Sequence, residues 1–273
     1  RDGGLHLGGP IVADRLFFFA AYNRKREETT FVNDPEAPQA TAFPSTTNVR
    51  TTDSYALKAN ASLGSNHALD LGAFGDPGSS ALANQNGFGI ESADPLAKQS
   101  ALEFGGHNQV LRWSGVFGSS LFVEAQAARA QSSFEELLGA EADRHPVSDY
   151  TVSPVVRSGG LGGFDAGSRS TNLQYSVKGT NLWGAHELRY GAQFEDIGYG
   201  GGFDISGPGF RTSDGRQTTT GASIVVQEGS VYGLPVEKVY EAFALLSPPR
   251  KSSTTEYLSL FAQDSWDVTG HLN

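Results

Sequence analysis

Short turns and long connections alternate along this sequence, and that alternation constrains the fold more than any other feature. Three short turns lie at residues 64–66, 118–120 and 181–185, and each contains glycine. On both sides of each turn, apolar and polar residues alternate at period two, which is typical of strands with two chemically different faces. The sequence therefore predicts three antiparallel hairpins. They cover residues 53–74, 109–127 and 171–195.

The connections between the hairpins are long and rich in glycine, proline, serine and asparagine, which favour turns and loops. They run roughly over residues 31–52, 76–98, 136–168 and 198–253. Structureless loops of more than about 15 residues are uncommon in compact soluble domains, so these connections argue against that class. Short turns at one end and long loops at the other are instead typical of outer-membrane β-barrels. Segments that begin near Gly3, Arg15 and Gln99, together with the three hairpins, give about nine strands. A further candidate strand covers residues 256–266.

The charged residues of the predicted strands share one face. By alternation, that face holds Lys58, Arg112, Glu124, Lys178, Arg189 and Glu195. A lysine or arginine that faced lipid at the middle of a bilayer would cost about 2–4 kcal/mol, so we expect these side chains to face the barrel lumen. The opposite faces, which hold Leu57, Val123, Val177 and Leu188, are expected to meet lipid.

Alternation also occurs in soluble β-sandwiches, which turn their polar residues outward, so that class stays open on this evidence alone. Several residues on the apolar faces are alanines, such as Ala59, Ala125 and Ala192, which would pack a sandwich core poorly. We therefore predict an all-β fold that is part of an antiparallel transmembrane outer-membrane β-barrel.

Composition excludes several other classes of protein. Glycine makes up 34 of the 273 residues, against a usual share of about 7%, which disfavours helices. The longest apolar run covers only residues 16–22, whereas a membrane-spanning helix needs about 20. Cysteine is absent, which excludes disulfides and thiolate metal sites, and the net charge of -10 argues against nucleic-acid binding. Methionine is absent even at position 1, so we expect the chain to be part of a longer protein.

Three stretches carry motifs that are more specific than alternation. Residues 7–19 read LGGPIVADRLFFF and resemble a signature near the start of the barrel in TonB-dependent outer-membrane receptors of the Oar-like type. Residues 183–191 read WGAHELRYG and resemble a turn-and-strand segment of the same barrels. Residues 257–266 read YLSLFAQDSW and resemble a recurrent strand. The three stretches occur in the family's order.

The resemblance implies a barrel of about 22 strands that is closed by an N-terminal plug. Residues 1–273 would be part of that barrel domain, with the plug and any other N-terminal domain before Arg1. The implied function is energy-coupled uptake or binding of an external ligand at the outer membrane of a Gram-negative bacterium. The implied partners are outer-membrane lipid, the TonB complex through the plug, and an unidentified external ligand. A passive outer-membrane channel and a secreted β-rich adhesin are alternatives.

Candidate ligand-binding residues lie in the longest connection, residues 198–253, because binding residues concentrate on loops held by a rigid scaffold. This connection could equally be a lid over the barrel mouth. The candidates are Tyr199, Phe203, Phe210, Arg211, Arg216 and Tyr232. Phe164, in the connection over residues 136–168, is a further aromatic candidate. A second set of aromatic residues lies beside predicted short turns, where interfacial anchors are common. These are Phe17, Phe18, Phe19, Trp183 and Trp266.

Sequence motifs give no support to an enzyme. His186 and Glu187 are followed by Leu-Arg-Tyr, so the second histidine of a zinc-binding HExxH motif is absent. The nucleophile motif GxSxG and the phosphate-binding motif GxxxxGK[ST] are absent as well. We therefore expect no catalytic residues, no metal site and no cofactor.

Overall fold

A computed structural model describes residues 1–32, 34–36, 45–83, 100–139, 143–153, 155–160, 163–218, 221–244 and 250–268. Its named elements are all β-strands. Within this part of the chain, no helix is long and apolar enough to cross a membrane.

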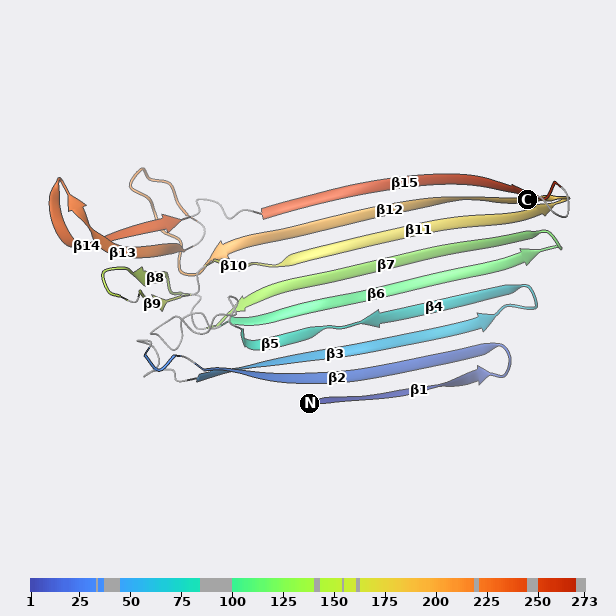
Figure 1. Cartoon of the computed structure of the whole chain (residues 1–273), viewed down its shortest axis with the longest axis horizontal. Helices are drawn as coiled ribbons and strands as arrows, with labels where there is room; N and C mark the ends of the chain where they lie inside the picture. Colours follow the sequence, from blue (N-terminus) through green and yellow to red (C-terminus); the bar gives the residue numbers. More distant parts are fainter. Residues whose placement is uncertain are drawn as a thin grey trace.

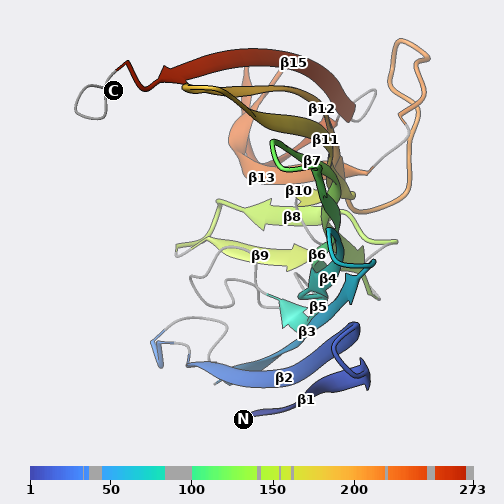
Figure 2. The ribbon, with the colours of Figure 1, turned by 90° about the vertical axis from the view of Figure 1, so that its right-hand side faces the viewer.

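Eleven strands form one antiparallel sheet, which we call the wall. The wall is drawn as a row of long, nearly aligned strands in Figure 1, and Figure 2 shows that it curves. Its strands are β1 (Asp2–Val12), β2 (Leu16–Val32), β3 (Ser45–Ser62), β4 (His67–Gly75), β5 (Gly78–Ala83), β6 (Ser100–Phe117), β7 (Leu121–Leu138), β10 (Gly163–Asp165), β11 (Ser168–Trp183), β12 (His186–Ile205) and β15 (Arg250–Trp266).

Two pairs of strands in the wall lie end to end. β4 and β5 both pair with β3 and β6 and are separated at Asp76 and Pro77. β10 and β11 both pair with β12. When each pair is counted once, the described wall has nine strand positions. The number equals the predicted count because two differences offset each other: two expected segments form one strand, and β15 adds a position. The segments expected from Gln99 and over residues 109–117 are one strand, β6, because its pairing with β7 continues through Gly105 and Gly106.

The turns are short at one end of the wall and long at the other (Figure 1). At the short-turn end, residues 13–15, 63–66, 118–120 and 184–185 connect the strands. This confirms the three predicted hairpins and adds one between β1 and β2. The last turn is tighter than expected because β11 continues to Trp183 and β12 begins at His186.

The long connections are shorter than the sequence suggested, because the strands continue into them. β2 extends to Val32 and β3 already begins at Ser45, and the two strands stay in register to that point. β12 extends through the glycine-rich residues 198–202 to Ile205, and β15 begins at Arg250. Glycine is depleted in strands, but hydrogen bonds to the neighbouring strands override that tendency on β12, and the β-branched threonines of β2 and β3 favour a strand themselves.

Two of the long connections together form a second sheet, which we call the cap sheet. Its strands are β8 (Pro146–Asp149), β9 (Val156–Gly159), β13 (Ala222–Val231) and β14 (Leu234–Ala244), in the order β14-β13-β8-β9. β8 and β13 are parallel. The cap sheet lies beyond the long-turn end of the wall (Figure 1). Ala222 and Val226 are buried here, and the backbone N–H of Ala222 donates to Nδ1 of His145 at 3.1 Å.

Many wall glycines stand directly opposite an aromatic residue on the next strand. Gly179 is paired with Tyr190, and Gly191 is paired with Phe261. A Cβ on Gly179 would lie 2.7 Å from the Tyr190 ring, so the ring covers the bare backbone of the glycine. Such pairs help to stabilise a curved sheet. Part of the high glycine content is therefore explained by glycines that leave room for an aromatic ring on the next strand.

The register of the wall separates a polar face from an apolar face. Residues that are directly paired across strands share a face, and residues two apart on a strand also share one. Glu124 is paired with Lys178 and with Ser114, two residues from Arg112. The same reasoning across the wall puts all six predicted charges on the polar face: Lys58, Arg112, Glu124, Lys178, Arg189 and Glu195.

Candidate functional site

The apolar face carries a band without charged side chains, and on four strands this band has nearly the same height. Counted from the short turns, the first charged residue on this face is Arg24 on β2, Asp53 on β3, Arg129 on β7 and Asp196 on β12. Each lies about eight to ten residues from its turn, which is close to the length of a membrane-spanning strand. On β6 and β11 the charge-free stretch is longer and ends at Glu103 and Arg169. On β15, Asp264 lies beside the turn and is hydrogen-bonded to His186 at 2.7 Å.

A pocket of about 730 Å³ lies on the polar face at the long-turn end of the wall, and we call it the mouth pocket. It draws residues from six strands because the register brings their ends to one place. Its larger side chains are Leu102, Phe134, Phe164, Asp165, Tyr199, Phe203 and Lys251. The pocket thus combines aromatic rings with one acidic and one basic side chain.

Glycines allow two aromatic rings of the mouth pocket to lie against the backbone. A Cβ on Gly201 would lie 2.8 Å from the hydroxyl oxygen of Tyr199, and a Cβ on Gly163 would overlap the Phe203 ring. Tyr199 is 48% exposed and Phe203 is 44% exposed. The two rings therefore present roughly half of their surface to anything that enters the pocket.

The polar groups of the pocket are held by local hydrogen bonds. The carboxylate of Asp165 accepts hydrogen bonds from the N–H of Gly167 at 2.9 Å and from the hydroxyl of Ser168 at 2.6 Å. Next to the pocket, Glu136 is paired with Leu102 and is only 2% exposed. Its Oε1 accepts a hydrogen bond from the hydroxyl of Ser100, whereas Oε2 has no partner among the described residues.

The lining of the mouth pocket is suited to binding a ligand. Mostly apolar and aromatic walls with a few placed polar groups are typical of ligand sites. Among the described residues, no group of three or more histidine, aspartate or glutamate side chains is arranged to hold a metal ion.

Comparisons with known proteins identify the fold. No protein-family model matches the sequence, and no curated protein gives a significant match. Among solved structures, the chain is similar to the outer membrane transporter YddB from Escherichia coli, with a TM-score of 0.55 and 12% identity over 97% of this chain and 32% of that one. It is also similar to the siderophore receptor PiuA from Acinetobacter baumannii, with a TM-score of 0.50 and 12% identity over 98% of this chain and 38% of that one.

The chain has the fold of part of an outer-membrane β-barrel. It spans about a third of the length of the two receptors. The partial coverage agrees with nine strand positions in a wall whose two outer strands, β1 and β15, each pair on one side only in the described structure. Because the sequence identity is only 12%, this structural similarity shows the fold alone.

The structure brings only two of the six candidate ligand residues into the mouth pocket. Tyr199 and Phe203 line it, although both lie on β12 and not in a loop. Phe210 packs near His145, with 6.3 Å between the ring centres. The others lie apart from the pocket lining: Arg211 is bridged to Gln217, Arg216 is paired with Asp214 at 2.6 Å, and Tyr232 is fully exposed at the tip of the β13–β14 hairpin.

The five expected anchor residues do not form one girdle. Trp183 and Trp266 both lie at the short-turn end on the apolar face, and Trp266 stacks on His186 with 5.3 Å between ring centres. Phe18 is on the apolar face as well. Phe17 and Phe19 are on the polar face, where Phe19 is paired with Lys58, because side chains alternate along β2.

Sequence reasoning missed most of the pocket lining. The predicted hairpin ends at residue 127, although the same period leads on along β7 from Glu124 to Phe134. Extending the pattern would therefore have found Phe134. Phe164, a candidate from the connection over residues 136–168, lines the pocket as well. No local signal places Phe164 and Asp165 in the wall, because β10 becomes part of the wall only by pairing with the distant end of β12.

Proposed function

We propose that this chain forms part of the barrel wall of a TonB-dependent, Oar-like receptor that binds or imports an external ligand. The observation that carries the proposal is the mouth pocket, at the long-turn end of the polar face of a transporter-type barrel wall. The three motif stretches lend support, because they lie at the short-turn end: residues 7–19 include the β1–β2 turn, residues 183–191 include the β11–β12 turn, and residues 257–266 end β15.

In the proposed orientation, the polar face lines the lumen and the apolar face meets lipid. The interior of such barrels is polar and their outer surface carries an apolar band, which matches the two faces of the wall. The short turns then lie in the periplasm, and the mouth pocket and cap sheet lie on the outside of a Gram-negative cell. Leu57, Val123, Val177 and Leu188 contact lipid in this arrangement.

The mouth pocket would be an early contact for a solute that arrives from outside. Tyr199 and Phe203 can stack on a flat or apolar part of the ligand, while Asp165 and Lys251 bind its polar groups. In the mechanism implied by the family resemblance, a plug encoded before Arg1 closes the lumen, and the TonB complex pulls on that plug to open a path. This chain's own part is to hold the wall and to position the mouth pocket.

Conductance of the full-length protein in a planar lipid bilayer separates this proposal from a passive channel. We expect a closed barrel that begins to conduct, reversibly, at urea concentrations that unfold a plug but leave the barrel folded. A barrel that conducts freely without urea would contradict the proposal and would indicate a passive channel.

A binding experiment tests the mouth pocket itself. The full-length receptor is titrated with three probes: a ferric tris-catecholate complex, maltohexaose and a tripeptide. For any probe that binds, the double variant Tyr199→Ala/Phe203→Ala should weaken affinity by about tenfold or more, since buried aromatic contacts dominate binding energy. Tyr232→Ala, at the hairpin tip, is the matched control and should bind as the wild type does. Equal affinity in the double variant would remove the pocket from the proposal.

A further inference from the structure

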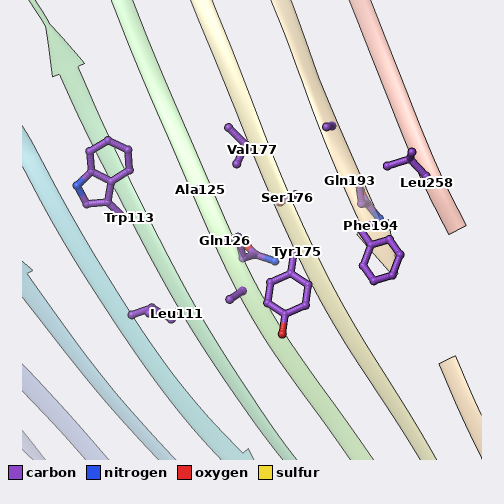
Figure 3. Close-up of a pocket in the computed structure, with 12 residues that line it drawn as sticks. Leu111, Trp113, Ala125, Gln126, Tyr175, Ser176, Val177, Gln193, Phe194 and Leu258 are labelled. Carbon is purple, nitrogen blue, oxygen red and sulfur yellow. The ribbon is translucent and has the colours of Figure 1, made fainter. Parts of the chain in front are cut away.

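A second hollow, of about 450 Å³, lies on the apolar face, and we call it the β7 groove. Its floor on β7 is formed by Ala125 and Ala127. Trp113 and Ala125 are directly paired, as are Ala125 and Val177. In the next row on the same face, Leu111, Ala127 and Tyr175 are paired in the same way. Figure 3 shows the large side chains of β6 and β11 standing on either side of the small residues of β7.

The walls of the β7 groove project well above its floor. Leu111 is 43% exposed and Tyr175 is 50% exposed, so both rise from the sheet. Phe194 on β12 and Leu258 on β15 continue the tyrosine side of the groove (Figure 3). A linear hydrocarbon chain in the groove would be contacted from the floor and from both sides, whereas a flat strand surface contacts it from one side only.

A cation lies at the end of the groove that is nearer the long turns. Arg129 is the next residue after Ala127 on the same face of β7. Its guanidinium donates to Oε1 of Gln131 at 2.9 Å, and no carboxylate among the described residues forms an ion pair with it. The nearest acid in the same row, Asp196, is separated from Arg129 by Leu173. Arg129 therefore lies where the charge-free band ends and is available to an anion.

We infer that the β7 groove binds an anionic, phosphate-bearing lipid of the outer leaflet, with one acyl chain in the groove and the phosphate at Arg129. The inference rests on the proposed orientation, in which the apolar face meets lipid. An apolar hollow followed directly by a cation reproduces the order of groups in such a lipid. Arginine binds phosphate in a planar, two-pronged geometry, which favours this headgroup over a neutral one.

The test uses the full-length receptor in nanodiscs that contain either phosphatidylglycerol or phosphatidylcholine with a photoreactive diazirine on one acyl chain. After illumination, mass spectrometry locates the labelled residues. We expect labels on Ala125, Ala127 and Val177, and we expect phosphatidylglycerol to label them about fivefold more than phosphatidylcholine, the factor of one cation near an anionic headgroup.

Two variants separate the groove from the cation. Ala127→Phe fills the floor and should abolish labelling by both lipids, whereas Ala59→Phe, on the same face of β3, should leave it unchanged. Arg129→Gln should remove the preference for phosphatidylglycerol and keep the labelling by phosphatidylcholine. Arg24→Gln is the matched control, because Arg24 is already paired with Asp53 at 3.7 Å.

The possible results distinguish a failure of this inference from a failure of the proposed orientation of the wall. If both lipids label the groove equally, or if Ala127→Phe and Arg129→Gln leave the labelling unchanged, the inference of a bound lipid is wrong. The apolar face would still lie in the membrane. Labels concentrated on the polar face, at Glu124 or Lys178, would overturn the orientation itself. Receptor-to-receptor crosslinks through the groove, in place of lipid labels, would assign it to a second copy of the chain and also overturn the inference.

Discussion

A Cβ on Gly105 would lie 2.4 Å from the carbonyl oxygen of Asp76. This close approach occurs where the strand position shared by β4 and β5 is interrupted. Asp76 is anchored there by two hydrogen bonds: its N–H donates to the carbonyl of Gly106 at 3.1 Å, and its Oδ1 accepts from the N–H of Gly106 at 2.9 Å. Gly105 also has a φ of 121°, a conformation that residues with a Cβ rarely adopt.

Gly105→Ala should therefore lower the free energy of unfolding of the barrel by about 1–3 kcal/mol, because the neighbouring atom is backbone that is held in place. Urea unfolding of the full-length protein in detergent micelles, followed by tryptophan fluorescence, measures the change. Gly9→Ala is the control, since a Cβ on Gly9 would meet nothing within 4 Å. Equal unfolding midpoints for the two variants would show that the wall tolerates a side chain at position 105, beside the break between β4 and β5.

Acid should loosen the cap sheet. The pKa of Asp149 is lowered, first by hydrogen bonds from the hydroxyl and N–H of Thr151 and then by Lys238 on β14, whose ammonium lies 3.2 Å away. A carboxyl whose pKa is lowered by folding stabilises the folded state above its ordinary pKa of about 3.9, and that contribution is lost as pH falls through the folded-state value. We expect amide hydrogen exchange in β8 and β14 to accelerate, relative to the wall, below about pH 4.

Two variants check the assignment to Asp149. Asp149→Asn should show the faster exchange in β8 and β14 already at neutral pH. Asp214→Asn should not, because the pKa of Asp214 is lowered chiefly by Arg216 within the same turn, and this pair joins no two strands. Exchange in the cap sheet that stays the same in both variants would contradict the role of the Asp149–Lys238 contact.

His145 should hold the two long connections together. Its Nδ1 accepts a hydrogen bond from the N–H of the buried residue Ala222. His145→Ala leaves that N–H without a partner and should lower the free energy of unfolding by about 1–3 kcal/mol. On whole cells, the variant should be cut by added protease within residues 206–218 faster than the wild type. His6→Ala, on β1, serves as the control. If His145→Ala is cut no faster than this control, the hydrogen bond does not secure the cap sheet.

The faces of the wall could be predicted from sequence, because apolar and polar residues partition at period two within each strand. The positions of Glu124 and Lys178 follow from that rule alone, and their direct pairing agrees with it. The cap sheet could not be predicted, since the parallel pairing of Val147 with Ile224 joins segments far apart in the chain and leaves no local pattern. Tyr199 could be predicted as a candidate ligand contact. Asp165 could not, because it reaches the mouth pocket only through the pairing of β10 with the distant end of β12.

The proposed orientation of the wall is tested most directly by nitroxide spin labels on the full-length receptor in a lipid bilayer. Single labels are placed at Leu57, Val123 and Leu188 on the apolar face and at their neighbours Lys58, Glu124 and Arg189 on the polar face. We predict that labels on the apolar face collide with oxygen dissolved in the bilayer and are shielded from a water-soluble nickel complex, and that labels on the polar face do the reverse. Oxygen contact at Lys58, Glu124 and Arg189, with nickel contact at the other three positions, would contradict the account.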